Sequence, residues 1–523
     1  MSNAATHPNE INDLTINIVN FNRKSVVNVS NITGHWNIYE SIFNNHCTCD
    51  LILTDAIHLL SRLPIVGEEY VVFQYKTAGL KGDGETFTLR TRSFRIYKIS
   101  ERTESTEGQQ DYKLHGIDDH YFINEGHDIN ASFVGQNCIK ACKDIFKTYF
   151  IDPEEFRPFD IQTGALYGYN KEVCRNSENS SSYISPGNTP IEVINYLKDE
   201  AIHTDTNDTS NYLFFQNIDG YHLVTLSELK GKGRSFAYFV KDGGVKSTSS
   251  IEEKRSDLTT TSLRNSVLDY QFKKSFDTLK NIDSGMYGNR VVAIDLLTKK
   301  FDERIFNYNT EWPRLSPIES GLEAAKLSSE DSLHKQIGST QTRFIATELL
   351  TSSIPTGNPT NFSLSEHPSY KQTPYFYPID KSDPDEMKDK LTGTIKNEDA
   401  DKRVESLVSN DSRIANPRNK HLKLNREVGS LASLDNIILD VVLPGNSDLP
   451  AGQIIEVYIP DSNNKDSKYI NFFNQESPRF LVTDVRQTYL RGQTSFITTA
   501  TIVKDSYGIS IEKQFELERE VSE

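Results

Sequence analysis

The residues of this chain that could do chemistry are carboxylates, thiols and histidines that lie near one another in the sequence. Glu40 comes shortly before Asp50. Cleavage of a glycosidic bond needs two such carboxyl groups, one as the acid and one as the base or nucleophile. A chain with 73 Asp and Glu residues contains many pairs of this kind by chance. The pair therefore favours a glycan-cleaving enzyme only weakly.

A second candidate cluster is formed by Asp118, Asp119 and His120, which combine two carboxylates with a titratable imidazole. Such a group could act in general acid–base catalysis. Its counterpart in the internal repeat described below reads Lys504, Asp505 and Ser506, and it keeps only one acidic position. The repeat therefore favours a structural strand end over a catalytic cluster.

The five cysteines are an odd number, which argues against a disulfide framework. Cys47 and Cys49 lie on a strand-like stretch near His46 and His58, and Cys138 and Cys142 lie four positions apart on an expected helix. The first group could hold zinc, but no second pair follows at ligand spacing. Buried thiols are the favoured interpretation.

The chain also lacks the short motifs of common enzymes. There is no phosphate-binding Gly-Lys-Ser/Thr loop, no His-Glu-x-x-His and no Gly-x-Ser-x-Gly. The glycine-rich segment 79–85 is typical of a hairpin loop, because a phosphate cradle needs a helix after it. We expect no enzymatic activity, no catalytic, cofactor-binding or metal-binding residues, and no cofactor.

Length and composition indicate several strand-rich domains. The 523 residues suffice for roughly three or four domains, and 24 Tyr and 27 Phe suit half-buried strands. No apolar run reaches the ~20 residues needed to cross a bilayer, and the start lacks the pattern of a secretory signal. The net charge of −16 disfavours tight binding to nucleic acid. We therefore expect folding in a cytoplasm, with no membrane partner.

The sequence contains two copies of one β-domain. Leu53 precedes Leu63-Pro64 by ten positions, and Leu439 precedes Leu449-Pro450 by the same ten. Further segments correspond in the same order: 94–96 with 480–482, and 117–121 with 503–507. Long turns and antiparallel returns predict a small barrel or a strongly curved sheet in each copy. We expect the second copy to begin at 267–276 and to continue through 289–306.

Helices are expected between the copies. Ser132 is the predicted cap of a helix that buries Val134, Cys138, Ala141, Ile145 and Tyr149. Thr189, Pro190 and Glu192 predict a second helix start through a capping box. The segments 211–217 and 221–226 predict a hairpin.

The expected class is a β-rich α+β fold with two similar tube-forming β-barrel domains, an α+β domain between them and a largely polar insertion. The insertion holds nine of the 19 prolines and two expected helices, near 319–337 and 384–410. The domains are predicted as follows: a first barrel at 1–123, a middle domain at 124–261, a discontinuous second barrel at 262–311 and 425–507, the insertion at 312–424 and a charged tail at 508–523.

Segments in order along nearly the whole chain resemble one family. They are 38–45 with 53–55 and 63–69, then 211–215 with 219–222, then 284–289 with 295–300, and finally 443–446 with 449–452 and 479–485. Together they resemble the baseplate hub of contractile-tailed bacteriophages (myoviruses), the adapter between tail tube and spike. The insertion at 312–424 departs from the family pattern.

The resemblance implies a structural homotrimer without catalytic residues. Its three chains would supply six barrels in a ring that joins the six-fold tail tube, or a tube-initiator protein, to a separate three-fold central spike protein. Other baseplate proteins are further candidate partners, through the insertion. DNA would only pass through the lumen, with no sequence-specific binding. The implied location is the tail baseplate of a virion, assembled in the host cytoplasm.

Two other functions stay open from the sequence. One is a tail-associated hydrolase that degrades peptidoglycan, and the other is a β-rich tail protein that binds a receptor or carbohydrate. A zymogram would identify the first, and binding to glycans or whole cells would identify the second.

Overall fold

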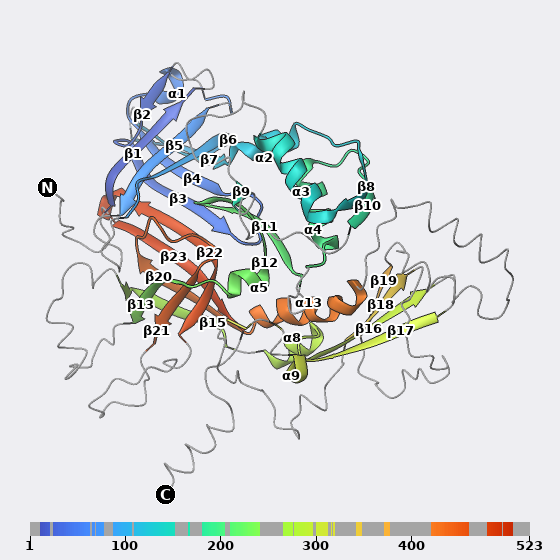
Figure 1. The fold of residues 1–523 in the computed structure, drawn as a ribbon. Helices are drawn as coiled ribbons and strands as arrows, with labels where there is room; N and C mark the ends of the chain where they lie inside the picture. Colours follow the sequence, from blue (N-terminus) through green and yellow to red (C-terminus); the bar gives the residue numbers. More distant parts are fainter. Residues whose placement is uncertain are drawn as a thin grey trace, which may run out of the picture.

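The fold was obtained as a computed structural model. It describes residues 11–20, 25–62, 65–67, 69–77, 87–106, 109–151, 166–167, 180–203, 210–240, 265–275, 277–295, 300–311, 315, 317–318, 341–347, 371–376, 420–459, 478–493 and 495–505. Strands dominate this part of the chain, and 14 of them form one large sheet (Figure 1). The predicted β-rich α+β class is confirmed.

The first strand set is antiparallel and lies at the start of the chain. Its strands hydrogen-bond in the order β3-β4-β7-β6-β5-β1, and the short β2 (Val26–Asn28) extends the edge at β1. Alternate residues of β4, such as Leu51 and Leu53, are fully buried, as the period of two along a strand requires. The bounds are β1 Ile11–Val19, β3 Thr33–Ser41, β4 Thr48–Asp55, β5 Tyr70–Thr77, β6 Arg90–Thr106 and β7 Gln109–Ile117, with α1 (Leu59–Arg62) after β4.

The second strand set comes mostly from the end of the chain. Its strands hydrogen-bond in the order β15-β20-β23-β22-β21-β13, and β14 (Ser266–Val267) lies beside β13. Leu439, Val441 and Leu443 of β20 fill its core. The bounds are β13 Arg234–Val240, β15 Asp269–Lys274, β20 Ile437–Pro444, β21 Ile454–Tyr458, β22 Arg479–Leu490 and β23 Ser495–Lys504.

The two sets share one pairing order and, around one bulge, one register. Arg95 lies opposite Ile117 between β6 and β7, and Leu481 lies opposite Val503 between β22 and β23. The register then shifts at the same place in each pair, after Ile96 in β6 and after Val482 in β22. Such β-bulges bend and twist a strand locally, so the two sheets bend at equivalent points. One difference is that β1 is antiparallel to β5, whereas β13 is parallel to β21.

The register corrects one predicted correspondence. Leu53 of β4 lies opposite Tyr112 of β7, and the equivalent of Tyr112 in β23 is Thr498. Thr498 lies opposite Leu443, four positions after Leu439. Leu443 is therefore the structural equivalent of Leu53, and the equal ten-residue spacing to the two Leu-Pro steps was misleading. Residues 63–64 lie outside the described residues.

A middle region of helices and short strands follows the first set. The predicted capping box at Thr189 is present, and so is the predicted hairpin of β11 and β12. The predicted cap at Ser132 is wrong: that residue starts strand β8, and the helix begins at Cys138 with Asn137 as its cap. The bounds are α2 Asp119–Glu125, β8 Ser132–Asn137, α3 Cys138–Phe146, β9 Leu166–Tyr167, β10 Ser180–Ile184, α4 Pro190–Glu200, β11 Tyr212–Asn217, β12 Gly220–Thr225 and α5 Leu226–Lys230.

A separate four-stranded sheet corrects the expected course of the second β-domain. We expected residues 289–306 to continue it, but β16 (Gly288–Asp295) pairs with β17 (Lys300–Asn307) on one side and with β18 (Gln341–Thr347) on the other. β19 (Lys371–Phe376) completes this sheet. The helices near it are α8 (Thr278–Asp283), α9 (Tyr308–Glu311) and α13 (Lys420–Leu434). The helices predicted near 319–337 and 384–410, and the tail at 508–523, lie outside the described residues.

Within the described part of the chain, every helix is too short or too polar to span a bilayer.

Candidate assembly interface

The two strand sets meet edge to edge through β22 and β3. These strands pair antiparallel, from Asp484 opposite Ser41 to Leu490 opposite His35. The pairing makes the backbone of both sets one continuous sheet (Figure 1). The joint is thus a contact between two equivalent modules, formed at two different edges.

Aromatic rings fill the core behind this pairing. Trp36 of β3 has no exposed surface, and its ring centroid lies 6.0 Å from that of Tyr489 and 5.6 Å from that of Phe496, both in the second set. Phe73 and Tyr75 of the first set pack on the same indole at 5.4 and 5.2 Å. Large buried aromatic side chains dominate the energetics of cores and interfaces. Trp36 therefore brings rings from β22 and β23 of the second set into the hydrophobic core of the first set.

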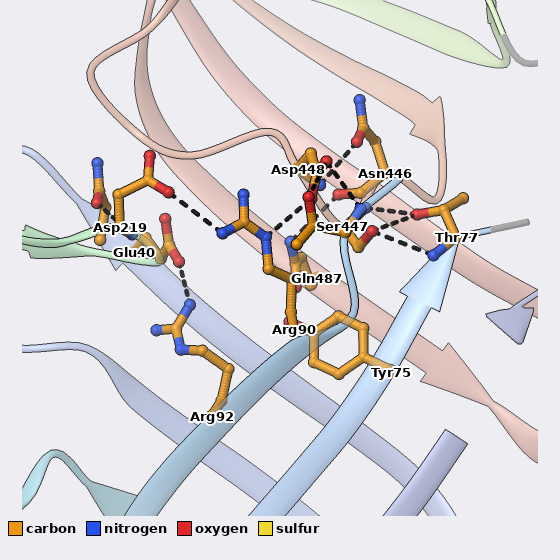
Figure 2. Close-up of polar contacts among 12 residues, drawn as sticks. Glu40, Tyr75, Thr77, Arg90, Arg92, Asp219, Asn446, Ser447, Asp448 and Gln487 are labelled. Carbon is orange, nitrogen blue, oxygen red and sulfur yellow. Dashed lines mark hydrogen bonds and ion pairs between the residues drawn. The ribbon is translucent and has the colours of Figure 1, made fainter. Parts of the chain in front are cut away.

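A buried ion pair lies beside this cluster (Figure 2). Arg92 of β6 donates from Nη1 to Oε1 of Glu40 on β3, and both side chains are almost completely buried. The other carboxylate oxygen of Glu40 accepts from the backbone N–H of Ala451 in the second set, at 3.2 Å. Burial raises the pKa of Glu40, and Arg92 and the Ala451 N–H oppose that rise. One carboxylate thus holds both sets.

Further polar contacts run from β5 and β6 to the loop after β20, to β22 and to the turn between β11 and β12 (Figure 2). Arg90 donates from Nε to Asp448 at 2.8 Å and forms an ion pair with Asp219 at 3.3 Å. Thr77 and Ser447 exchange hydrogen bonds between backbone and side chain, at 3.1 and 2.6 Å. The Tyr75 hydroxyl donates to Gln487 of β22. Buried polar groups satisfied across a joint fix its register as well as its stability.

The predicted cluster Asp118, Asp119 and His120 lies at the strand end, as the repeat predicted. Asp118 caps α2 and accepts from His120 Nδ1 at 2.6 Å, from Gln216 at 2.7 Å and from the Tyr221 hydroxyl at 3.1 Å. Although burial alone would raise the pKa of Asp118, these partners hold it well below its usual range. The carboxylate joins the first strand set to the β11–β12 hairpin.

The acidic position that the repeat retains has the same role in both copies. Asp119 forms an ion pair with Arg95 at 3.5 Å and accepts from the Tyr70 hydroxyl. Its equivalent Asp505 is fully buried and forms an ion pair with Lys230 at 3.0 Å. Both carboxylates therefore anchor the end of a strand to its surroundings.

The carboxylates proposed for glycan cleavage have separate partners. Glu40 is held in the joint, whereas Asp50 accepts from His115 at 2.7 Å and lies 3.1 Å from both Lys113 and the Tyr39 hydroxyl. Both groups are thus engaged in cross-strand contacts. Both carboxylates therefore have a structural role, in which they link neighbouring strands.

The thiols are core residues. Cys47, Cys49, Cys138 and Cys142 are buried and free of disulfides. Burial raises the pKa of both Cys47 and Cys49, which keeps them as neutral thiols. Burial also lowers the pKa of His46 to about 4, so its ring is neutral near pH 7. Among the described residues, no three His, Cys, Asp or Glu side chains gather as a metal site.

Apart from Glu40, the polar residues of the joint were not identified from the sequence. Arg92 lies in phase with the buried Phe94 and Ile96, two and four positions further along β6. A charged residue at a core position of a strand needs a buried partner. The position of Arg92 in the alternating pattern therefore indicates a buried charge, but it does not identify Glu40 as its partner.

No protein-family model and no curated protein matches this chain. Solved structures do match it over most of its length. A tail protein from Neisseria meningitidis is 10% identical with a TM-score of 0.42, and the match covers 95% of this chain and 98% of that one. The 43 kDa tail protein of prophage MuSo2 from Shewanella oneidensis is 7% identical with a TM-score of 0.45, covering 94% and 99%.

A third match is a component of the type VI secretion system of Escherichia coli, described as structurally similar to the T4 bacteriophage tail proteins gp27 and gp5. It is 10% identical with a TM-score of 0.35, and the match covers 91% of this chain and 75% of that one. All three are described as tail proteins or as components of a secretion system. At these identities and TM-scores, the function has to be argued from the chain itself.

Proposed function

We propose that this chain is the structural hub of a contractile phage-tail baseplate, in which three copies form a ring of six similar strand sets. The observation that carries the proposal is the β22–β3 joint between two equivalent sets. The contact is heterologous, because the edges that meet, β22 of one set and β3 of the other, differ. Heterologous contacts build rings when the rotation between neighbours closes.

The number of copies follows from the symmetry that the sequence resemblance implies. Three chains with two sets each present six modules to a six-fold tail tube or tube-initiator protein. The same three chains match the symmetry of a three-fold central spike protein. The segment 312–424 is the candidate contact to other baseplate proteins. The duplicated module thereby converts one symmetry into the other.

The role is structural, within the tail of a virion that is assembled in the host cytoplasm. A ring of this kind leaves a channel for the viral genome during ejection. The net charge of −16 supports passage of DNA without capture, since a negative surface repels phosphate. The carboxylates described above hold neighbouring strands together, and the described thiols are buried in cores. Both observations support a structural role.

Electron microscopy of the purified full-length chain tests this function. End-on averages should show a ring of six lobes around a hole, with three-fold symmetry at higher detail. Particles without a central hole would contradict the hub. A zymogram on peptidoglycan is the companion experiment, in which we expect no clearing; clearing would favour the hydrolase.

A further inference from the structure

One edge of β22 is divided between two partners. Its first residues pair with β21, from Arg479 opposite Glu456 to Leu481 opposite Ile454. Residues 484–490 pair with β3. The opposite edge is occupied along the strand by β23. Residues 484–490 of this edge therefore form the contact with the first strand set.

The equivalent strand β6 has the same divided edge, with one half open. Its first residues pair with β5, from Arg90 opposite Tyr75 to Arg95 opposite Tyr70. The matched register and bulge make residues 98–100 the equivalent of 484–486, and β6 then has two further register shifts of its own, after Ser100 and after Glu104. Within the described ranges, no strand pairs with 98–104 on this edge. The first set thus lacks the neighbour that the second set has.

The equivalent of β3 is β15, and it also has an open edge. β15 pairs with β20 as β3 pairs with β4, and β20 is its only neighbour among the described strands. Its side chains from Asp269 to Lys273 are exposed. The second set therefore offers the strand that the first set lacks.

The side chains of β15 fit a covered position. The equivalents of Trp36 and Ile38 are Tyr270 and Phe272, because each pair faces equivalent residues of β4 and β20. Trp36 and Ile38 are 0% and 1% exposed, whereas Tyr270 and Phe272 are 37% and 38% exposed. Open strand edges with exposed aromatic residues are ready to pair with another chain.

We propose that β15 of one copy pairs antiparallel with residues 98–104 of β6 in the next copy and repeats the β22–β3 joint between chains. This inference rests on the proposed ring and supplies its intermolecular contact. Transferring the register of β22 and β3 places Lys274 opposite Ser100 of the neighbour. The open edge of each copy is then filled by the next, head to tail, until the ring closes.

Engineered cysteines test this register in the full-length chain. The four described cysteines are buried, so we do not expect them to take part in cross-linking. The fifth is removed by the substitution Cys174→Ser in the background of all variants. Facing residues of an antiparallel pair have Cα atoms about 4.5–5.5 Å apart, within the range of a disulfide. The double variant Ser100→Cys with Lys274→Cys should form cross-linked dimers and trimers on mild oxidation. The matched control, Ser100→Cys with Asp269→Cys, places the thiols roughly 15 Å apart along the strand and should stay uncross-linked.

The mass of the unmodified assembly separates this inference from the proposed function. A trimer that cross-links at 100 and 274, but not at 100 and 269, supports both. A trimer in which the two pairs cross-link equally poorly overturns the strand pairing and leaves the ring standing. A monomer at high concentration overturns both.

A second pair of variants tests the same surface without oxidation. Phe272→Glu puts a charge into the contact and should convert the trimer to monomers, with an unchanged circular dichroism spectrum. Ile184→Glu is the matched control, because Ile184 is 73% exposed on β10 of the middle region, and it should leave the trimer intact. A trimer that persists in Phe272→Glu would overturn the inference.

Discussion

Asp50 and Asp440 occupy equivalent positions in the two strand sets, and each accepts a hydrogen bond from the residue that faces it on the next strand. His115 donates to Asp50 at 2.7 Å, and its equivalent Thr501 donates to Asp440 at 2.8 Å. The two modules thus share a polar cross-strand contact as well as a pairing order. Their edges are comparable residue by residue.

Arg92→Ala should destabilise the chain strongly. The substitution leaves the carboxylate of Glu40 buried without its cation, which typically costs about 3–5 kcal/mol. Urea denaturation measures the free energy of unfolding. Lys76→Ala is the control, because its ion pair with Asp13 is far more exposed and should be worth less than about 1 kcal/mol. Equal effects of the two variants would contradict the role of the buried pair.

Gly445→Ala should be destabilising because a Cβ at this position would lie 2.0 Å from Cδ1 of Phe496 and 2.6 Å from its carbonyl oxygen. Phe496 is fully buried against Trp36, so we expect a loss of about 1–3 kcal/mol from overpacking. Gly233→Ala is the matched control, with no atom within 4 Å of the added Cβ. Thermal unfolding should separate the two variants, and equal melting temperatures would refute the close approach.

His222→Gln should reduce the acid sensitivity of the fold. Burial lowers the pKa of His222 from 6.5 to about 3. Between these values the unfolded chain binds the proton and the folded chain does not, so stability falls as the pH falls. The contribution is at most about 1.4 kcal/mol per pH unit. Glutamine should remove this contribution, which urea denaturation at pH 7 and pH 4.5 would measure. An unchanged pH slope would contradict the prediction.

Trp312→Phe should leave Trp36 as a fluorescent reporter of the joint, because the chain has only two tryptophans. The buried indole should emit at short wavelength and shift to the red on unfolding. We expect this shift to coincide with the loss of the far-ultraviolet circular dichroism signal, as two probes of one transition do. A red shift at clearly lower denaturant would mean that the joint opens first.

The strands of both modules could be predicted from the sequence because their alternating apolar residues leave a clear pattern. Their exact correspondence could not. Leu439, Val441 and Leu443 all point to the core, so a shift by two or four positions along β20 gives an equally good pattern. Only the pairing of Leu443 with Thr498 settles the alignment.

Contacts between segments that are distant in the chain could not be predicted from the sequence either. The pairing of β16 with β18 joins residues on either side of a long intervening segment, and no local signal marks it. The capping box at Thr189 is local, and it was predicted correctly. The partners of Arg92 and Asp118 come from other strands, so the sequence singled out Asp118 without its contacts and did not mark Arg92.

The most direct test of the account is the mass of the purified full-length chain in solution, measured by light scattering after size-exclusion chromatography. The open edges of β6 and β15 predict a closed ring, and the symmetry implied by the resemblance sets it at three copies, so we expect three times the 59.4 kDa mass of the chain. A single species at 59.4 kDa across the concentrations tested would contradict the ring.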